Sequence, residues 1–176
     1  MLPAIIIVLI VVVAAWCITT INNFRRMEIK INESLSGVEV ALTKRYDMLT
    51  KLLETAKGYM KHETDLFTKV IELRSGMNVS ELNVAERSIG ELSGKVFAVA
   101  ENYPELRSDS VFNELQHGIR DSEEHLQAAR RLYNANVTAY NTAIAVFPSS
   151  ILRGSRQPKE FFAADESKKA DVKIEF

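Results

Sequence analysis

The sequence contains few of the residues that interrupt helices or link chains covalently. It has four prolines, seven glycines and one cysteine, Cys17, in 176 residues. So few prolines and glycines favour long helices, because these two residues are the strongest helix breakers. One cysteine excludes an intrachain disulfide, and Cys17 lies inside an apolar run, where a thiol keeps its proton and reacts poorly.

An excess of charge of one sign is also absent. The 22 lysines and arginines nearly balance the 23 aspartates and glutamates. Domains that bind nucleic acid concentrate positive charge, so the sequence gives no electrostatic reason to expect a nucleic-acid partner. Low-complexity segments are lacking as well, and a chain of this length holds one domain with a modest core.

Residue patterns of common enzyme classes are missing too. No glycine-rich phosphate loop is present, and no serine or cysteine lies in a nucleophile motif. Glu114 and His117 have the E-x-x-H spacing of di-iron bundles, but such a site needs two of these units and two further glutamates. Both residues oppose the apolar face of their helix, and His62 and His125 lack partners at ligand spacing. We therefore predict no enzyme activity, no metal site and no cofactor.

The most prominent feature that is present is an uncharged apolar run over residues 2–21. Twenty helical residues extend about 30 Å, which matches the hydrocarbon core of a bilayer. A secretory signal normally begins with a basic region, and none precedes Pro3. We therefore expect residues 1–23 to form a retained single-pass membrane anchor rather than a cleaved signal.

Basic residues follow the apolar run within three helical turns: Arg25, Arg26 and Lys30. Cytoplasmic flanks of membrane spans are enriched in lysine and arginine. This flank predicts a cytoplasmic location for the domain that follows and an amino terminus on the outer side. The arginines are also placed to contact anionic headgroups.

Apolar residues at steps of three and four indicate a first long helix from Met27 onward. Its stripe consists of Ile31, Leu35, Val38, Leu42, Tyr46, Leu49, Leu53, Ala56 and Met60. Gly58 and the polar residues 61–63 predict a break or kink near the end of this stripe. Residues 66–73 then predict a shorter helical segment, followed by a loop at residues 75–78.

Two further stripes predict two further helices. The first consists of Leu82, Ala85, Ile89, Leu92, Val96, Val99 and Tyr103, and Pro104 ends it. The second begins near residues 108–110, ends at Pro148 and consists of Phe112, Leu115, Ile119, Leu126, Ala129, Tyr133, Tyr140, Ile144 and Phe147. Asn83 and Glu86 resemble a capping pair, with Ser80 as the alternative start.

These patterns predict an all-α fold. A single transmembrane helix precedes an antiparallel up-and-down helical bundle over residues 24–148, and residues 149–176 form an extended tail. The bundle has three or four long helices, depending on the region around Gly58. The spacing favours packing close to that of a left-handed coiled coil.

A repeated pair of polar aromatic and amide residues lies on the last predicted helix. Tyr133 and Asn134 recur seven residues later as Tyr140 and Asn141, so the pairs lie on one helix face. Tyrosine hydroxyls and asparagine amides need hydrogen-bond partners when they are buried. The pairs indicate either a polar layer that fixes helix register or a polar pocket for a small ligand or peptide.

Two arginines, Arg130 and Arg131, precede the first of these pairs. We expect them to form salt bridges at the surface, with Asp47 or Glu54 of the first helix as partners, rather than a phosphate site.

The tail combines a linker with two interaction signals. Gly154, Pro158 and mixed charges indicate the linker. Phe161 and Phe162 are too apolar to stay exposed without cause, so we expect them to pack on the bundle. Residues 171–176 alternate in the manner of a strand, with Val172, Ile174 and Phe176 on one side. Such a strand needs a partner, which is either the bundle or another chain.

Several of these motifs resemble those of the bacterial LemA family. The resemblance rests on residues 44–49 (KRYDML), residues 53–59 (LETAKGY) with His62 and Glu63, residues 100–106 (AENYPEL) with Phe112 and residues 115–116, residues 129–134 (ARRLYN), residues 140–142 (YNT), residues 147–148 (FP) and residues 161–162 (FF). Thr50 stands where proline is common in the family. The resemblance implies an amino-terminal anchor, a helical bundle and an outside-to-inside topology. It implies no established molecular activity.

The sequence therefore favours a membrane-anchored cytoplasmic bundle that acts as an interaction or scaffold protein. We expect it to self-associate or to bind other membrane proteins. The alternative is a ligand-sensing bundle that uses the polar layer of Tyr133, Asn134, Tyr140 and Asn141.

Overall fold

The computed structural model describes residues 1–59 and 77–162. Its elements are α1 (Leu2–Lys57), α3 (Val79–Ala100), α4 (Pro104–Ser108), α5 (Ser110–Ala145) and a 3₁₀ helix η1 (Ser149–Leu152). No strand occurs within these two ranges, which confirms the predicted all-α class. The segment predicted at residues 66–73 and the alternating residues 171–176 lie outside the described residues.

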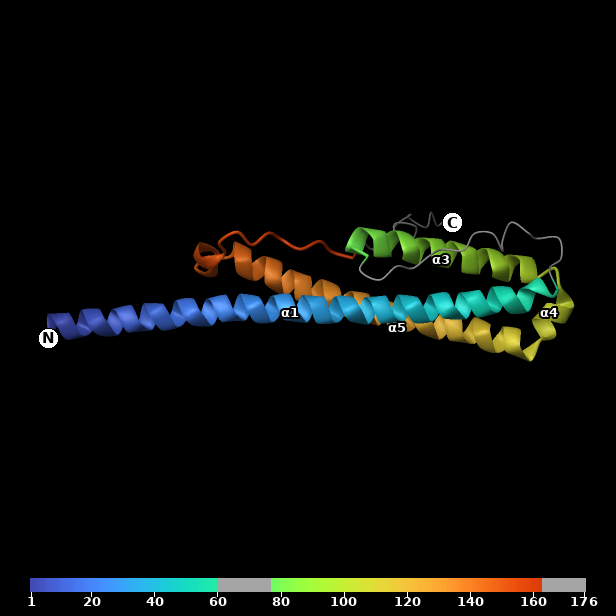
Figure 1. Cartoon of the computed structure of the whole chain (residues 1–176), viewed down its shortest axis with the longest axis horizontal. Helices are drawn as coiled ribbons and strands as arrows, with labels where there is room; N and C mark the ends of the chain where they lie inside the picture. Colours follow the sequence, from blue (N-terminus) through green and yellow to red (C-terminus); the bar gives the residue numbers. More distant parts are fainter. Residues whose placement is uncertain (60–76, 163–176) are drawn as a thin grey trace, which may run out of the picture.

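α1 is one continuous helix of 56 residues that begins in the apolar run and ends in the bundle (Figure 1). Among the described helices, it is the one that is long and apolar enough to cross a membrane. The predicted anchor boundary at residue 23 falls inside this helix, and the first buried side chain is that of Phe24. α1 ends at Lys57 with Gly58 as its cap, which agrees with the predicted break. No flexible linker therefore separates the apolar run from the bundle.

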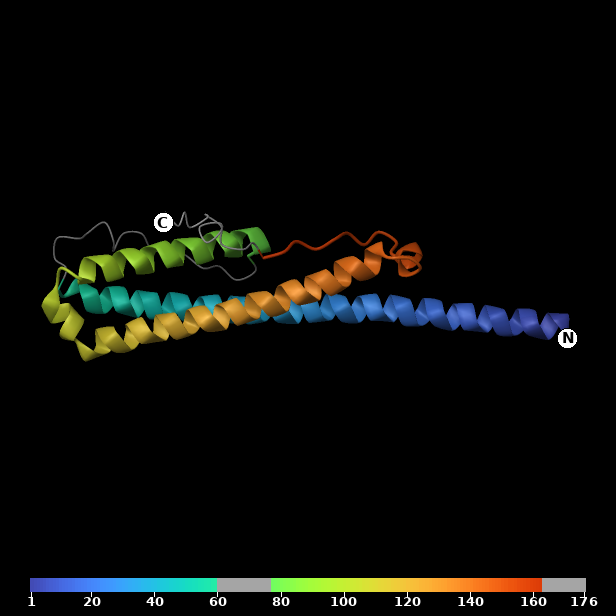
Figure 2. The same cartoon turned by 180° about the vertical axis from the view of Figure 1, so that it is seen from behind.

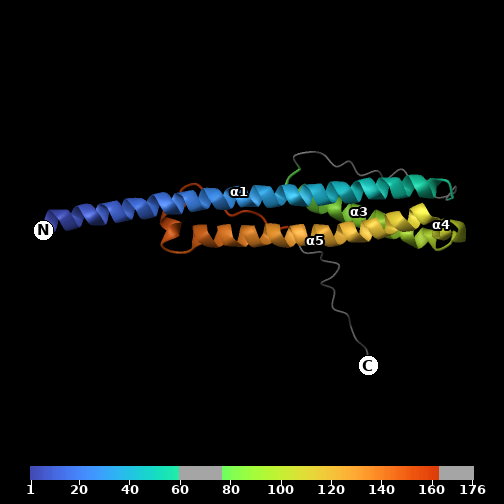
Figure 3. The same ribbon diagram turned by 90° about the horizontal axis from the view of Figure 1, so that it is seen from below.

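α1 packs mainly against α5, which runs in the opposite direction (Figure 2). α3 runs parallel to α1, because residues 60–76 lie between these two helices in the chain (Figure 1). The antiparallel arrangement of α1 and α5 agrees with the predicted up-and-down bundle, and the parallel arrangement of α1 and α3 fits its four-helix form, in which a further segment lies between them in the chain. Figure 3 shows α3 behind the α1–α5 pair, so α3 covers one face of that pair.

The α1–α5 seam has heptad spacing on both helices. Buried residues of α1 are Phe24, Ile31, Ser34, Val38, Leu42, Arg45, Leu49, Leu52 and Ala56. Buried residues of α5 are Phe112, Ile119, Ser122, Leu126, Arg130, Tyr133, Val137, Tyr140 and Ile144. Both series show the same steps of seven, three and four, which are typical of coiled-coil packing.

The predicted stripe of the first helix is partly wrong in phase. Leu35, Tyr46 and Leu53 are only half-buried, and their predecessors Ser34, Arg45 and Leu52 occupy the seam. A pattern of apolar residues selects the apolar neighbour where Ser34 and Arg45 take the buried position, and it does not distinguish Leu52 from Leu53 because both are leucines. Ser34 is tolerated there because its hydroxyl donates to the carbonyl groups of Lys30 and Ile31, both at 2.9 Å.

The predicted capping pair of Asn83 and Glu86 is wrong, whereas the alternative start near Ser80 is close to the observed start of α3 at Val79. Asn78 is the N-cap, and its side chain accepts a hydrogen bond from the Glu81 N–H at 2.9 Å. The Glu81 carboxylate accepts one from the Asn78 N–H at 2.7 Å, which completes a capping box. Asn83 lies inside the helix. α3 ends at Ala100, and Pro104 begins α4 instead of ending α3, because proline suits the first turn of a helix.

Candidate functional site

An extended segment, residues 153–162, follows η1 and runs back along the bundle. We call it the strap. Figure 1 shows it beside α5, on the same face of the α1–α5 pair as α3, which begins near the point where the strap ends. An extended segment cannot satisfy its own backbone hydrogen bonds, so it needs partners on the surface that it covers.

Two asparagines of α5, Asn134 and Asn141, provide those partners, and we call them the asparagine clamp. The Asn134 side chain accepts from the Phe162 N–H at 2.8 Å and donates to the Phe162 carbonyl at 3.0 Å. Asn141 makes the same two bonds with Lys159, at 2.8 and 2.9 Å. Each amide therefore pairs with both backbone groups of one strap residue, as a neighbouring strand would.

The spacing of the clamp matches the spacing of the strap. Seven residues of α-helix separate Asn134 from Asn141, which is about 10.5 Å. Three residues of extended chain separate Lys159 from Phe162, which is about 10 Å. The heptad repeat of the Tyr-Asn pairs thus sets the two amides at the interval that an extended backbone requires.

An aromatic anchor ends the strap. The Phe162 ring is 2% exposed and packs edge-to-face on Tyr133, with 6.0 Å between the ring centroids. The Tyr133 hydroxyl donates to the Glu160 carbonyl at 3.0 Å. The Arg130 guanidinium lies 5.4 Å from the centre of the Phe162 ring, a cation–π arrangement. Arg130 also forms a buried ion pair with Glu86 of α3.

A second group of contacts holds the start of the strap at the end of the bundle nearest the apolar run. The Arg156 guanidinium lies over the Phe24 ring, 5.2 Å from its centre, and its Nε lies 3.2 Å from the Glu28 carboxylate. The Tyr140 hydroxyl donates to the same carboxylate at 3.4 Å. Residues of α1, α5 and the strap therefore meet in one polar and aromatic cluster.

Burial raises the pKa of three groups in and beside this site. It raises the pKa of both Tyr133 and Tyr140, with the carboxylates of Glu160 and Glu28 adding to the effect. Both hydroxyls consequently stay protonated and act as donors. Burial also raises the pKa of Glu86, and the Arg130 charge opposes that rise.

Tyr133, Asn134 and Asn141 thus contact the chain's own tail, whereas the Tyr140 hydroxyl donates to Glu28 of α1. The two predicted roles of these four residues, a layer that fixes helix register and a polar pocket for a ligand, stay predictions. Of the two tail phenylalanines, Phe162 packs on the bundle as expected, whereas Phe161 is 51% exposed. Val172, Ile174 and Phe176 lie outside the described residues.

The arginine prediction is wrong in its partners and in its burial. Arg130 is buried and pairs with Glu86 of α3 rather than with Asp47 or Glu54 of α1. Arg131 is exposed. Of the membrane flank, Arg25 lies 3.6 Å from Glu28, and Arg26 and Lys30 are exposed.

Sequence reasoning missed two buried ion pairs. Besides Arg130 and Glu86, Arg45 of α1 lies 2.6 Å from the Glu123 carboxylate of α5. Both arginines occupy seam positions, and their heptad step between apolar residues was the available signal. Leu42, Arg45 and Leu49 are separated by steps of three and four, as apolar seam residues would be.

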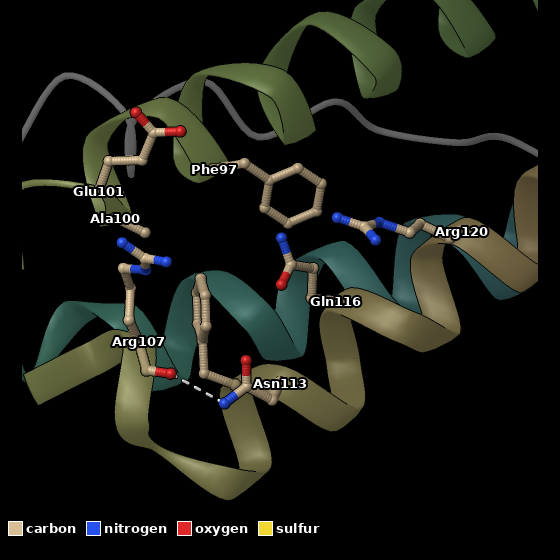
Figure 4. Close-up of a pocket in the computed structure, with 8 residues that line it drawn as sticks. Phe97, Ala100, Glu101, Arg107, Asn113, Gln116 and Arg120 are labelled. Carbon is tan, nitrogen blue, oxygen red and sulfur yellow. Dashed lines mark hydrogen bonds between the residues drawn. The ribbon is translucent and has the colours of Figure 1, made fainter. Parts of the chain in front are cut away.

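A cavity of about 400 Å³ opens at the other end of the bundle, between α3, α4 and α5. Figure 4 shows Arg107 and Arg120 reaching toward it from two sides, with the Gln116 amide between them. Phe97 and Phe112 line its apolar part. The Tyr-Asn residues do not line this cavity, so it is separate from the strap site.

The E-x-x-H residues lie where the sequence placed them. Glu114 and His117 are both exposed on α5. Within residues 1–59 and 77–162, no group of three or more histidine, cysteine, aspartate or glutamate side chains is arranged to hold a metal ion.

Comparisons with known proteins agree with the motif resemblance. The LemA family model matches residues 34–176, so the chain belongs to the LemA family. The chain is 25% identical over 133 residues to protein LemA of Metamycoplasma hominis, covering 72% of this chain and 60% of that protein. It is 28% identical over 64 residues to magnetosome protein MamQ of Magnetospirillum gryphiswaldense, covering 36% of this chain and 24% of that protein. The chain therefore spans less than two thirds of the length of either curated relative.

Proposed function

We propose that this LemA-family chain is a membrane-anchored, non-enzymatic interaction protein whose bundle self-associates by binding extended tail segments. The observation that carries the proposal is the asparagine clamp, in which Asn134 and Asn141 bind the backbone of Phe162 and Lys159. Backbone recognition by paired donors and acceptors is the chemistry of strand addition, which tolerates many side-chain sequences.

The strap is suited to exchange between two copies. It leaves the bundle at η1 and touches α5 again mainly through the clamp, Tyr133 and the buried Phe162 ring. A copy whose strap is displaced presents a vacant clamp, and the strap of a neighbouring copy carries the same partners for it. Exchange of identical elements is a low-cost route to oligomers.

The anchor supports such exchange by concentrating copies in one plane. α1 continues from the apolar run into the bundle without a break, so the clamps of neighbouring copies stand at the same height above the membrane. Arg25, Arg26 and Lys30 favour a cytoplasmic bundle by the positive-inside rule. Reporters fused after Phe176 and at Met1 test this orientation. Cytoplasmic activity only at Met1 would contradict it.

The oligomer mass of the full chain in detergent tests the proposal, with two truncations as matched variants. Ending the chain after Pro158 removes Lys159 and Phe162, and we expect it to lower the oligomer mass while the helical signal of the bundle persists. Ending the chain after Phe162 keeps the clamp partners and removes residues 163–176, so the oligomer should survive. A monomeric full-length protein would exclude self-association, and dissociation by both truncations would assign it to residues 163–176.

A ligand-sensing bundle is the second candidate, and the structure gives it less support. The amide groups that a ligand would need are already bonded to the strap backbone, so a ligand would have to displace the strap. Ligand-sensing predicts that small peptides release the strap without changing the oligomer mass.

A further inference from the structure

The turn between α5 and the strap carries an exposed apolar surface. We call residues 146–152 the tip. Phe147 is 77% exposed, Ile151 68% and Val146 52%. Large apolar side chains exposed together usually mark a surface that contacts another apolar phase.

The tip is held in a defined conformation, so this exposure belongs to the fold. The Ser149 hydroxyl donates to the carbonyl groups of Ala143 and Val146, at 2.6 and 2.9 Å. Leu152 is half-buried and packs against the core. One side of the tip therefore binds the bundle, and the side with Val146, Phe147 and Ile151 faces outward.

The tip lies at the end of the bundle nearest the apolar run. In Figures 1 and 3, the turn after α5 is the part of the described bundle closest to the amino terminus, and it lies beside α1. Thr20 and Cys17, one and two turns before Phe24 on the same helix face, are half-buried, whereas Thr19 is exposed. α1 is therefore covered on this face to a level inside residues 2–21.

The height of the tip follows from helix geometry. The strap returns to α1 at Phe24, where Arg156 lies over the ring. Phe24 is three residues beyond Ile21, the last residue of the apolar run, which is about 4.5 Å along the helix axis. The tip precedes Arg156 in the chain and lies on the membrane side of it, so the tip reaches the boundary between headgroups and acyl chains.

Basic side chains predominate around the tip, where Glu28 of α1 pairs with Arg25 and Arg156. Residues 146–159 contain no acidic residue and three basic ones: Arg153, Arg156 and Lys159. Arg153 is exposed immediately after η1, and Arg25 and Arg26 are exposed on α1 at the same end of the bundle. Basic side chains next to an apolar surface suit anionic headgroups.

We infer that the tip inserts into the surface of the bilayer that α1 crosses, with Phe147 and Ile151 among the lipids and Arg153 at the headgroups. This inference rests on the membrane anchoring proposed above and adds a second, interfacial contact beside the span. Two contacts on one rigid helix pair hold the bundle upright on the membrane and keep the clamp face at a fixed height. A bilayer fits better than a second copy, because the tip is continuous with the apolar run and its rim is basic.

Tryptophan quenching by brominated lipids tests the inference in the full chain. Trp16 is the single tryptophan, so the unmodified protein reports whether α1 is in the bilayer. Phe147→Trp and Ile151→Trp, each in a Trp16→Phe background, report on the tip. Val111→Trp in the same background is the control, because Val111 is 53% exposed at the other end of α5. The vesicles contain phosphatidylcholine and phosphatidylglycerol brominated near the headgroup end of the acyl chain.

We expect a loss of fluorescence at positions 147 and 151 comparable to that of Trp16, with no loss at position 111. Quenching of Trp16 without quenching at 147 and 151 overturns the inference and leaves the anchor intact. A blue-shifted but unquenched tryptophan at 147 also overturns it, because protein and not lipid then covers the tip. An unquenched Trp16 removes the anchor, and the inference with it.

Discussion

Two different structures cover the same face of the α1–α5 pair. Near the apolar run the cover is the strap, and farther from it the cover is α3 (Figure 1). A helix bonds its own backbone, so α3 needs only an apolar stripe, which includes Leu82, Ile89 and Val96. The strap has no such internal bonds, so α5 must supply polar side chains to it. The kind of cover therefore determines which residues α5 needs.

The residues at equivalent heptad positions of α5 differ between the part beneath the strap and the part beneath α3. Counting back in sevens from Asn141 and Asn134 gives Gln127 and Arg120, and counting back from Tyr140 and Tyr133 gives Leu126 and Ile119. Gln127 donates to Glu123 on its own helix, at 2.8 Å. The two amides that bind the strap backbone, and the tyrosine that reaches it, occur on α5 where the strap lies. Beneath α3 the equivalent tyrosine positions hold the buried apolar residues Leu126 and Ile119, and the equivalent amide positions hold Gln127 and the exposed Arg120.

Arg130 joins the two covers, so replacing it should have the largest effect. It pairs with Glu86 of α3 and lies over Phe162 of the strap. Arg130→Met leaves the Glu86 carboxylate buried without its partner, and such a loss costs about 3–5 kcal/mol. Urea unfolding of the full chain in detergent measures the free energy.

Arg131→Met is the matched control, because Arg131 is exposed on the next position of α5. Its free energy of unfolding should stay within about 0.5 kcal/mol of the unmodified protein. Equal effects of the two variants would show that the Arg130–Glu86 pair does not hold the covers together.

Leu92→Ala should weaken the packing of α3 on the α1–α5 pair and leave the strap in place. Leu92 is buried on α3, and truncating a buried leucine costs about 2–5 kcal/mol. Leu115→Ala should cost less, because Leu115 is only half-buried. Exposed Glu114 and His117 should tolerate alanine within about 0.5 kcal/mol. Thermal melting of the four variants ranks them, and a large loss for His117→Ala would contradict its surface position.

The sequence predicted the helices better than the covers. Heptad spacing located α1, α3 and α5 because periodic burial needs only a list of apolar residues. It did not reveal that Ser34 and Arg45 take seam positions, since a list of apolar residues does not register a polar side chain that is buried with a hydrogen-bond or ion-pair partner. It pointed to Tyr133, Asn134, Tyr140 and Asn141 as a unit, yet the strap that binds them has no periodic pattern of its own.

Asn134→Ala should release the strap and leave the helical cover in place. The substitution removes both hydrogen bonds to Phe162, and the loss should be about 1–3 kcal/mol because the backbone groups of Phe162 are half-buried. Hydrogen exchange should become faster at the Phe162 and Lys159 amides and stay unchanged in α3. Gln127→Ala, one heptad earlier, is the control and should leave both amides protected. Loss of protection in α3 as well would mean that the two covers unfold as one unit.

Acid should destabilise the end of the bundle that lies farthest from the strap. We expect this loss of stability to be smaller than the losses from Arg130→Met, Leu92→Ala and Asn134→Ala. Asp109 caps α5 by accepting from the Phe112 N–H at 2.9 Å, and the Tyr59 hydroxyl donates to it at 3.0 Å. These bonds lower the pKa of the Asp109 carboxyl, with the Phe112 bond contributing most. A lowered pKa means that the folded chain binds this proton less readily than the unfolded chain. The stabilisation is therefore complete above the ordinary aspartate pKa and is lost as the pH falls through the lowered value.

Asp109→Asn separates this titration from capping, because asparagine caps a helix about as well as aspartate. The difference in melting temperature between the two proteins should be constant near neutral pH, and the unmodified protein should lose melting temperature relative to Asp109→Asn below about pH 4, the ordinary aspartate range. Glu86 titrates in both proteins, and its raised pKa acts in the opposite sense, so the comparison cancels its contribution. Strap amides should stay protected over the same range in both proteins. A fall in the melting temperature of Asp109→Asn relative to the unmodified protein over the same range would reverse the assigned direction of the Asp109 pKa shift.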